Sequence, residues 1–126
     1  MDGTPYVPLD PDLQEIRLLQ IAPGNYDDDL VISLRVKRLI KRRPKFNALS
    51  YVWGKEKCPR KVVLDGHSVT VGQNLDGALR QLRRSMGGHL LWIDALCINQ
   101  DDVVERSQQV QMMGEVFSSA KDATYQ

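Results

Sequence analysis

The stretch from Leu90 to Gln100, LLWIDALCINQ, constrains the fold of this chain more than any other part of the sequence. It begins with apolar residues and contains a single carboxylate at Asp94, followed by the thiol of Cys97 and the side-chain amides of Asn99 and Gln100. A short apolar run, a polar turn and a long segment of helical periodicity are typical of a buried strand that leads into a helix. The same order of strand and helix precedes it over residues 61–87. This alternation predicts an α/β domain in which helices flank a mixed sheet.

Three strands and a hairpin account for the segments upstream. Residues 12–21 have an apolar spacing that fits a short helix, although LLQI within them also fits a strand. Residues 30–40 alternate between apolar and polar side chains, which predicts a half-exposed strand, and residues 46–53 form the next one. Residues 61–71 predict a hairpin, because Asp65-Gly66 is a strong signal for a two-residue turn.

Two helices are predicted. The first is capped by Asn74 and ends at Gly87-Gly88, with apolar residues on one side and arginines on the other: Leu75, Ala78, Leu79 and Leu82 against Arg80, Arg83 and Arg84. The second is capped by Asp101 or Asp102, and Asp102 with Glu105 resembles a capping box. Its expected apolar stripe is Val103, Val110, Met113, Val116 and Phe117.

Length and charge narrow the class of protein. A chain of 126 residues with 42% hydrophobic content is long enough for one compact domain. A formal net charge of +1 gives no general attraction to nucleic acid or to a membrane surface, and no apolar run is long enough to span a bilayer. Cys58 and Cys97 lie far apart and no secretory signal precedes them, so we expect reduced thiols in the cytoplasm, with the nucleus as an alternative.

Two long motifs resemble one known family. ALSYVWG (residues 48–54) followed by LWIDALCINQ (residues 91–100) is similar to the fungal heterokaryon incompatibility (HET) domain, and the similarity continues through ERSQQV (residues 105–110). On this resemblance residues 1–28 are a lead-in arm, in which residues 12–21 favour a strand, and residues 29–126 are the N-terminal portion of the domain. HET domains usually continue into a segment that contains tryptophan and glutamate. We therefore expect the chain to be truncated and its sheet to be incomplete.

The resemblance implies a function through proteins rather than through small molecules. HET domains take part in non-self recognition after cell fusion and trigger regulated cell death, so protein partners or self-assembly are expected, without a cofactor. They are distantly similar to TIR domains, which have a flavodoxin-like fold and in some cases cleave NAD. An alternative is therefore an NAD-cleaving enzyme, with NAD as the substrate, whose catalytic acid lies beyond this chain. A further alternative is an inactive gene fragment, and the chain as given is not expected to be an enzyme.

Asp94 has two interpretations. At the carboxyl end of a strand it could hold a ribose hydroxyl or a cation, or act in acid–base chemistry. It could instead accept hydrogen bonds from backbone N–H groups of the turn that follows, and this structural interpretation is favoured. Asn99 and Gln100 could bind a polar ligand, but as a turn or cap residue Asn99 needs no ligand. Glu105 suits the first turn of a helix, and Arg106 is expected to reach back and pair with Asp94.

The aromatic and thiol candidates each have a structural interpretation beside a functional one. Trp53 and Trp92 could line a pocket or belong to the core, and Gly54 suggests a close approach of the backbone. Cys97 lies between Leu96 and Ile98 without a nearby histidine, so we expect a buried thiol rather than a nucleophile. No spacing of cysteine and histidine fits a metal site.

Seven basic residues crowd the segment from Arg35 to Lys45. They could form a nuclear-import patch or contact phosphates. No aromatic residues interleave them, so a solvated strand edge is the favoured interpretation.

Overall fold

The computed structural model describes residues 4–39, 45–50 and 58–125. It divides into two compact units, each assembled from segments that alternate along the chain. Unit 1 consists of residues 1–5, 20–34 and 53–89, and unit 2 consists of residues 6–19, 35–52 and 90–126. The predicted boundary at residue 28 is not tested by this division and stays a prediction. The strands β1 (Glu15–Ile21) and β2 (Val31–Arg38) each pass from one unit to the other.

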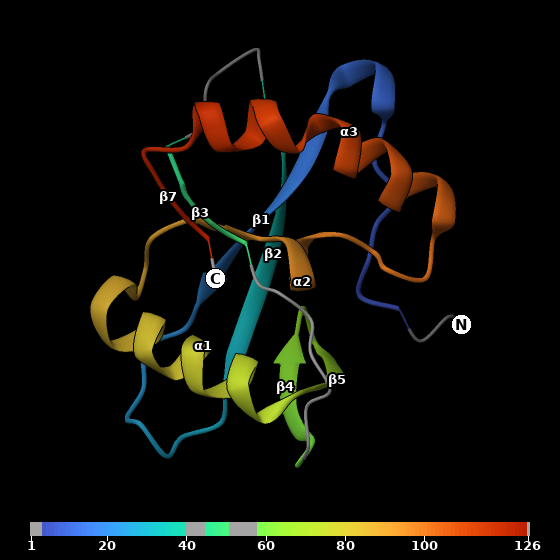
Figure 1. The fold of residues 1–126 in the computed structure, drawn as a ribbon. Helices are drawn as coiled ribbons and strands as arrows, with labels where there is room; N and C mark the ends of the chain where they lie inside the picture. The colour runs from blue at the N-terminus through green and yellow to red at the C-terminus, as the bar shows by residue number, and fades with distance from the viewer. Residues whose placement is uncertain (1–3, 40–44, 51–57, 126) are drawn as a thin grey trace. The chain divides into compact units, whose positions relative to one another are not determined.

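Unit 1 contains a hairpin, one helix and the first half of β2. Strands β4 (Arg60–Leu64) and β5 (His67–Val71) pair antiparallel, and β4 pairs in parallel with β2, where Val31 lies opposite Val63. Asp65 and Gly66 turn the hairpin with φ values of 50° and 83°, the left-handed geometry of the predicted turn. Helix α1 (Gln73–Met86) follows β5 directly (Figure 1).

Helix α1 differs from its prediction at two points. It begins at Gln73 with Gly72 as the N-cap, because the Gly72 carbonyl closes the first turn with the Asp76 N–H, so Asn74 lies inside the helix and does not cap it. Arg83 is not on an outer face as predicted but is only 5% exposed. The reason is the loop before β2, which presents backbone carbonyls to its guanidinium.

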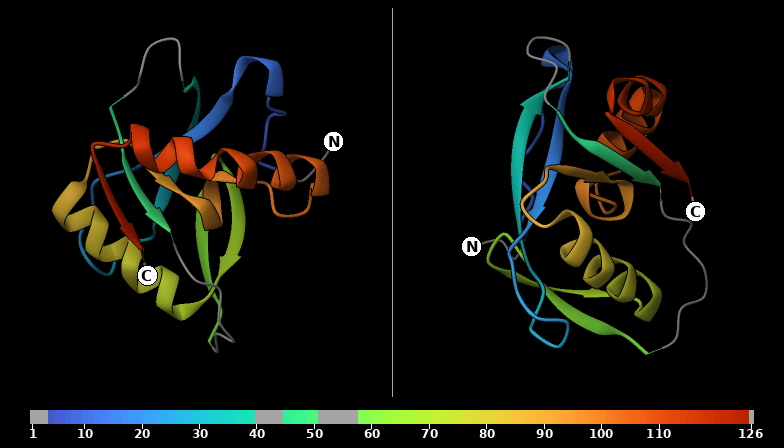
Figure 2. Two further views of the ribbon diagram at one scale, coloured as in Figure 1. Left: turned by 45° about the horizontal axis from the view of Figure 1, so that its top comes forward. Right: turned by 90° about the vertical axis from the view of Figure 1, so that its left-hand side faces the viewer.

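Unit 2 contains the segment from Leu90 to Gln100. Strand β6 (Leu91–Ile93) lies between β1, antiparallel, and β3 (Asn47–Ser50), parallel, and β3 pairs in parallel with β7 (Asp122–Tyr125). A single helical turn, α2 (Asp94–Cys97), follows β6, and helix α3 (Val103–Ser119) leads into β7, as Figures 1 and 2 show. A short 3-10 helix, η1 (Pro11–Leu13), lies within the predicted lead-in arm.

The buried side of α3 is the clearest departure from the predicted pattern. Val103 and Val110 are 66% and 54% exposed, whereas Glu105, Gln109 and Val116 are buried. The predicted apolar stripe is therefore wrong at its N-terminal half. The buried polar residues of α3 have partners inside the unit: Glu105 accepts from Arg17 of β1, and the Gln109 amide donates to the Glu15 carbonyl at 3.1 Å.

The predicted fold class is confirmed, because each unit combines parallel and antiparallel strand pairs with helices. The strand predicted over residues 12–21 is confirmed as a strand rather than a short helix. The two candidates Trp53 and Gly54, and part of the basic segment 35–45, lie outside the described residues. Within the described part of the chain, no helix is long and apolar enough to cross a membrane.

Candidate functional site

Asp94 begins α2 instead of lying in a loop, and its contacts come from two other elements. The Ser50 hydroxyl at the end of β3 donates to Asp94 Oδ2 at 3.1 Å. The Gln100 amide donates to the Asp94 carbonyl oxygen at 3.0 Å. The parallel pairing of β3 with β6 brings the ends of these two strands to the same edge, which is why Ser50 reaches Asp94. Asp94 thus links a strand end, a helical turn and the loop that follows.

Asn99 and Asp102 build the turn between α2 and α3. Asn99 Oδ1 accepts from the Asp101 N–H at 3.2 Å, and the Asn99 carbonyl accepts from the Asp102 N–H at 3.1 Å. Asp102 is the N-cap of α3, because its carboxylate accepts from the Glu105 N–H at 3.1 Å. The predicted cap is therefore confirmed. The reciprocal half of the capping box is wrong, since the Glu105 carboxylate turns inward instead.

Glu105 forms a buried ion pair with Arg17 of β1, and sequence reasoning missed this partner. Both oxygens of Glu105 accept from the two terminal nitrogens of Arg17 at 2.7 Å, and the Arg17 and Glu105 side chains are 1% and 8% exposed. Glu105 Oε2 also accepts from the Asn99 N–H at 2.7 Å. The missed signal was a lone arginine within the apolar strand sequence EIRLLQI, together with polar side chains one helical turn apart at Glu105 and Gln109.

Arg17 extends this network to the N-terminal arm. It donates to the carbonyls of Cys97 at 3.1 Å and Val7 at 2.7 Å, so one guanidinium connects four segments of unit 2. The Tyr6 ring lies 4.8 Å from the guanidinium carbon, and the Tyr6 hydroxyl donates to the Leu96 carbonyl at 2.9 Å. We name the set Tyr6, Arg17, Asp94, Asn99 and Glu105 the joint.

The pKa values of Tyr6 and of Cys97, whose carbonyl accepts from Arg17 of the joint, are both raised. Burial raises the pKa of Cys97 to about 12, and the fully buried thiol stays protonated. The prediction that Cys97 is a buried thiol is confirmed, and the prediction that it is not a nucleophile stays a prediction. Burial, with a smaller contribution from Cys97, raises the pKa of Tyr6 to about 12. Both side chains therefore stay protonated at neutral pH.

Trp92 and Arg106, two further predicted residues that the structure describes, lie in the core and at the surface, respectively. Trp92 is fully buried and its ring meets the Phe117 ring edge-on, with centroids 5.5 Å apart, so it belongs to the core. Arg106 donates to the Gln100 carbonyl at 3.3 Å. The predicted pair of Arg106 with Asp94 is absent from the ion pairs between described residues, because Arg106 is exposed and Asp94 faces β3. No cluster of three metal-ligating side chains occurs in the described ranges.

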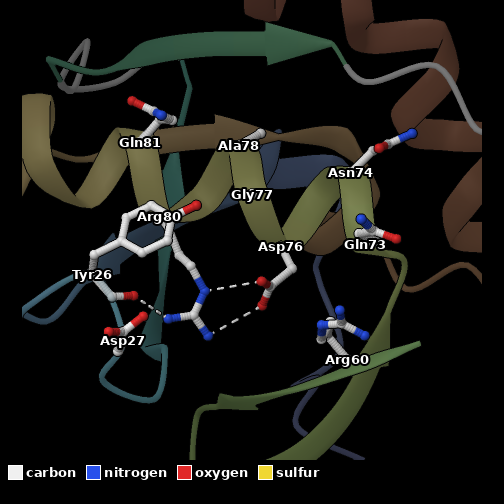
Figure 3. A pocket seen from close by; sticks show the side chains of 10 residues that line it. All are labelled: Tyr26, Asp27, Arg60, Gln73, Asn74, Asp76, Gly77, Ala78, Arg80 and Gln81. Carbon is white, nitrogen blue, oxygen red and sulfur yellow. Dashed lines mark hydrogen bonds and ion pairs between the residues drawn. The ribbon is translucent and has the colours of Figure 1, made fainter. Parts of the chain in front are cut away.

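A polar pocket of about 590 Å³ lies in unit 1, and none of the predicted site residues lines it (Figure 3). The first turns of α1 form one wall, and Tyr26, Asp27 and Arg60 form the rest. Asp76, only 7% exposed, pairs there with Arg80 at 2.9 Å between Oδ2 and Nε. The lining contains carboxylates, guanidinium groups and amides but no serine, cysteine or histidine. The pocket can therefore hold a polar molecule.

Comparison with known proteins assigns the chain to a family. The family model described as heterokaryon incompatibility protein (HET) matches residues 46–125, which confirms the resemblance predicted from the two motifs. Heterokaryon incompatibility protein 6, OR allele, of Neurospora crassa is 39% identical over 119 residues, a match that covers 83% of this chain. It covers only 17% of that much longer relative. No solved structure matches the chain, so the distant similarity to TIR and flavodoxin-like folds stays a prediction.

Proposed function

Because the chain belongs to the HET family, we propose that it acts in fungal heterokaryon incompatibility as a module for non-self recognition. In this proposal it passes on a regulated cell-death signal by assembling with other proteins. Its partners are proteins, including further copies of itself, and it acts in the cytoplasm without a cofactor. A role in the nucleus is the alternative location.

The observation that carries the proposal is the engagement of the family motif's polar side chains with one another. Asp94 accepts from Ser50, and Glu105 accepts from Arg17 and from the Asn99 backbone, so these groups join α2 to β3 and α3 to β1. A catalytic carboxylate has to be aimed at a substrate and at a proton that it transfers. A motif that fixes a strand end against a helix instead gives a rigid surface, which suits protein recognition.

The test exploits the difference between a carboxylate and an amide at Asp94. In Asp94→Asn an amide oxygen can still accept from the Ser50 hydroxyl, although the negative charge is lost. We expect induced expression of the wild-type chain in a fungal host to reduce viability, and Asp94→Asn to retain this effect. Glu105→Gln, which breaks the joint, should abolish it.

A second measurement separates assembly from catalysis. The purified chain is incubated with NAD while nicotinamide release is followed, and its mass is measured in parallel by sedimentation at increasing concentration. Assembly without nicotinamide release supports the proposal. Nicotinamide release that Asp94→Asn abolishes would instead establish the NAD-cleaving alternative, and full viability of cells expressing the wild-type chain would refute a death signal from it.

A further inference from the structure

Strand β2 has one side on which its pairing stops halfway. The Leu30 and Ile32 carbonyls accept from the N–H groups of Val63 and Asp65, at 2.9 and 2.7 Å, so these even-numbered residues face β4. The pairing with β4 ends at Ile32, because the Asp65-Gly66 turn then directs the chain away into β5. One more contact follows, from the Leu34 N–H to the Asp65 carboxylate at 3.4 Å.

Strand geometry shows which backbone groups lie beyond that point. The Val31 carbonyl accepts from Ala22 and the Leu39 N–H donates to Gln14, so the odd-numbered residues at both ends of β2 face the β1 side. Backbone groups alternate between the two sides of a strand. The N–H and C=O groups of Val36 and Arg38 therefore point to the side of β2 that faces away from β1. No strand formed by residues 4–39, 45–50 and 58–125 pairs with them there.

The side chains along this edge are basic and exposed. Lys37 lies on one face of the strand, and Val36 and Arg38 lie on the other, since side chains alternate between faces. Val36 is 39% exposed although Ile32, on the same face, is buried. The edge thus combines open hydrogen-bonding groups, positive charge and one apolar side chain.

We propose that residues 35–38 form a docking edge at which an extended, acidic segment of a partner protein adds as a further strand. Main-chain hydrogen bonds to Val36 and Arg38 would supply the affinity, and acidic side chains opposite Lys37 would supply the specificity. Apolar residues would alternate with the acids and lie beside Val36. The inference goes beyond the proposed function, since it assigns a binding edge for an acidic strand. Its test measures peptide binding and needs no cell-death readout.

A second copy of the chain does not fit this edge. Antiparallel pairing of two copies centred on Val36 would place Lys37 opposite Arg35, and like charges opposite each other destabilise a strand pair. Lysine at an open edge also opposes pairing between identical strands. An acidic strand reverses the sign of both effects, and this complementarity identifies the occupant.

The test uses the purified whole chain and a fluorescein-labelled peptide in which glutamate and valine alternate. Fluorescence anisotropy should show saturable binding of this peptide and none of a lysine–valine peptide of equal length. Two further peptides carry N-methyl groups on all valine amides or on all glutamate amides. Since only one set of amides faces the edge, one methylated peptide should lose binding and the other should retain it.

Protein variants give an independent arm of the same experiment. The double variant Lys37→Glu/Arg38→Glu should bind the acidic peptide about tenfold more weakly or worse. Arg84→Glu, a single charge reversal on the exposed side of α1, should bind as the wild type does. Absence of saturable binding, or equal loss with both methylated peptides, would overturn the proposal. Displacement of the peptide by an oligonucleotide at lower concentration than by unlabelled peptide would do so as well, in favour of a nucleic-acid surface.

Discussion

Arg17 shows how a single residue can decide which side of a helix is buried. It lies in a strand whose other inner side chains are apolar, and it is almost completely buried. A buried guanidinium has to be paired and hydrogen-bonded, because the cost of removing it from water is high. Glu105 meets that requirement and thereby displaces Val103 and Val110 to the surface of α3.

Glu105→Gln should reveal this dependence at the level of a single side chain. The amide keeps the shape of the carboxylate but leaves Arg17 without its counter-charge, so we expect the free energy of unfolding to fall by about 3 kcal/mol. Urea unfolding followed by circular dichroism measures the change. Glu115→Gln, an exposed glutamate on the same helix, is the matched control and should change the stability little. Equal effects of the two substitutions would show that the ion pair is not a major source of stability.

At the scale of elements, period and turn chemistry predicted most of the fold. The strand 31–38, the hairpin with its Asp65-Gly66 turn and the two long helices follow from local patterns that the tertiary structure obeys. The buried side of α3 does not follow from the spacing of its apolar residues, because its first buried positions are polar. The short turn α2 was missed for a related reason: a single turn carries too few residues to show a period.

The candidate site was predictable in part. Asp94 and Asn99 were identified from the motif, and the turn made by Asn99 is observed. The partner of Asp94 is Ser50, 44 positions away, and the partner of Glu105 is Arg17, 88 positions away. No local sequence pattern connects either pair. The pocket beside α1 was not foreseen either, although Asp76 and Arg80 have the spacing of a helical ion pair.

The loop before β2 depends on Arg83 of α1, which gives a prediction for an element without regular structure. Arg83 donates to the carbonyls of Asn25, Tyr26, Asp28 and Asp29. In Arg83→Met these carbonyls lose a charged donor, so we expect amide hydrogen exchange at Asn25 and Asp28 to become about tenfold faster. Exchange should not reach the unprotected rate, because Arg80 also donates to this loop.

The control for this prediction is the neighbouring Arg84→Met, which changes the same type of residue at an exposed position. Its loop amides should exchange as in the wild type. Unchanged exchange in Arg83→Met would mean that the loop is held by its internal bond between Asp28 and Asn25 and by Arg80 alone.

At the scale of the whole molecule, the half-buried Tyr6 hydroxyl and the buried Cys97 thiol of unit 2 make stability depend on alkaline pH. The pKa of Cys97 rises from 9.0 to about 12 and that of Tyr6 from 10.0 to about 12, mainly through burial. Above pH 9.0 the unfolded chain releases protons that the folded chain retains. Stability is therefore fully present below this pH and declines as the pH rises towards 12, on the order of a few kcal/mol.

Urea unfolding at a series of alkaline pH values measures this decline. The double variant Tyr6→Phe/Cys97→Ala, which lacks both groups, should show a flatter dependence on pH even if its stability is lower throughout. The corresponding double variant at exposed positions, Tyr26→Phe/Cys58→Ala, should keep the wild-type slope. Equal slopes in all three proteins would show that Tyr6 and Cys97 do not control alkaline stability.

The division into interleaved units has a consequence for anyone who dissects the molecule. The backbone returns to each unit more than once, so every unit is a mosaic of distant pieces of sequence. Shortening the gene from either end cannot excise one unit intact. Isolating unit 1 would require its separate segments to be joined by new linkers, or the chain to be cut and the pieces supplied together. Genetic dissection of this protein should therefore rely on point substitutions such as Glu105→Gln and Arg83→Met rather than on deletions.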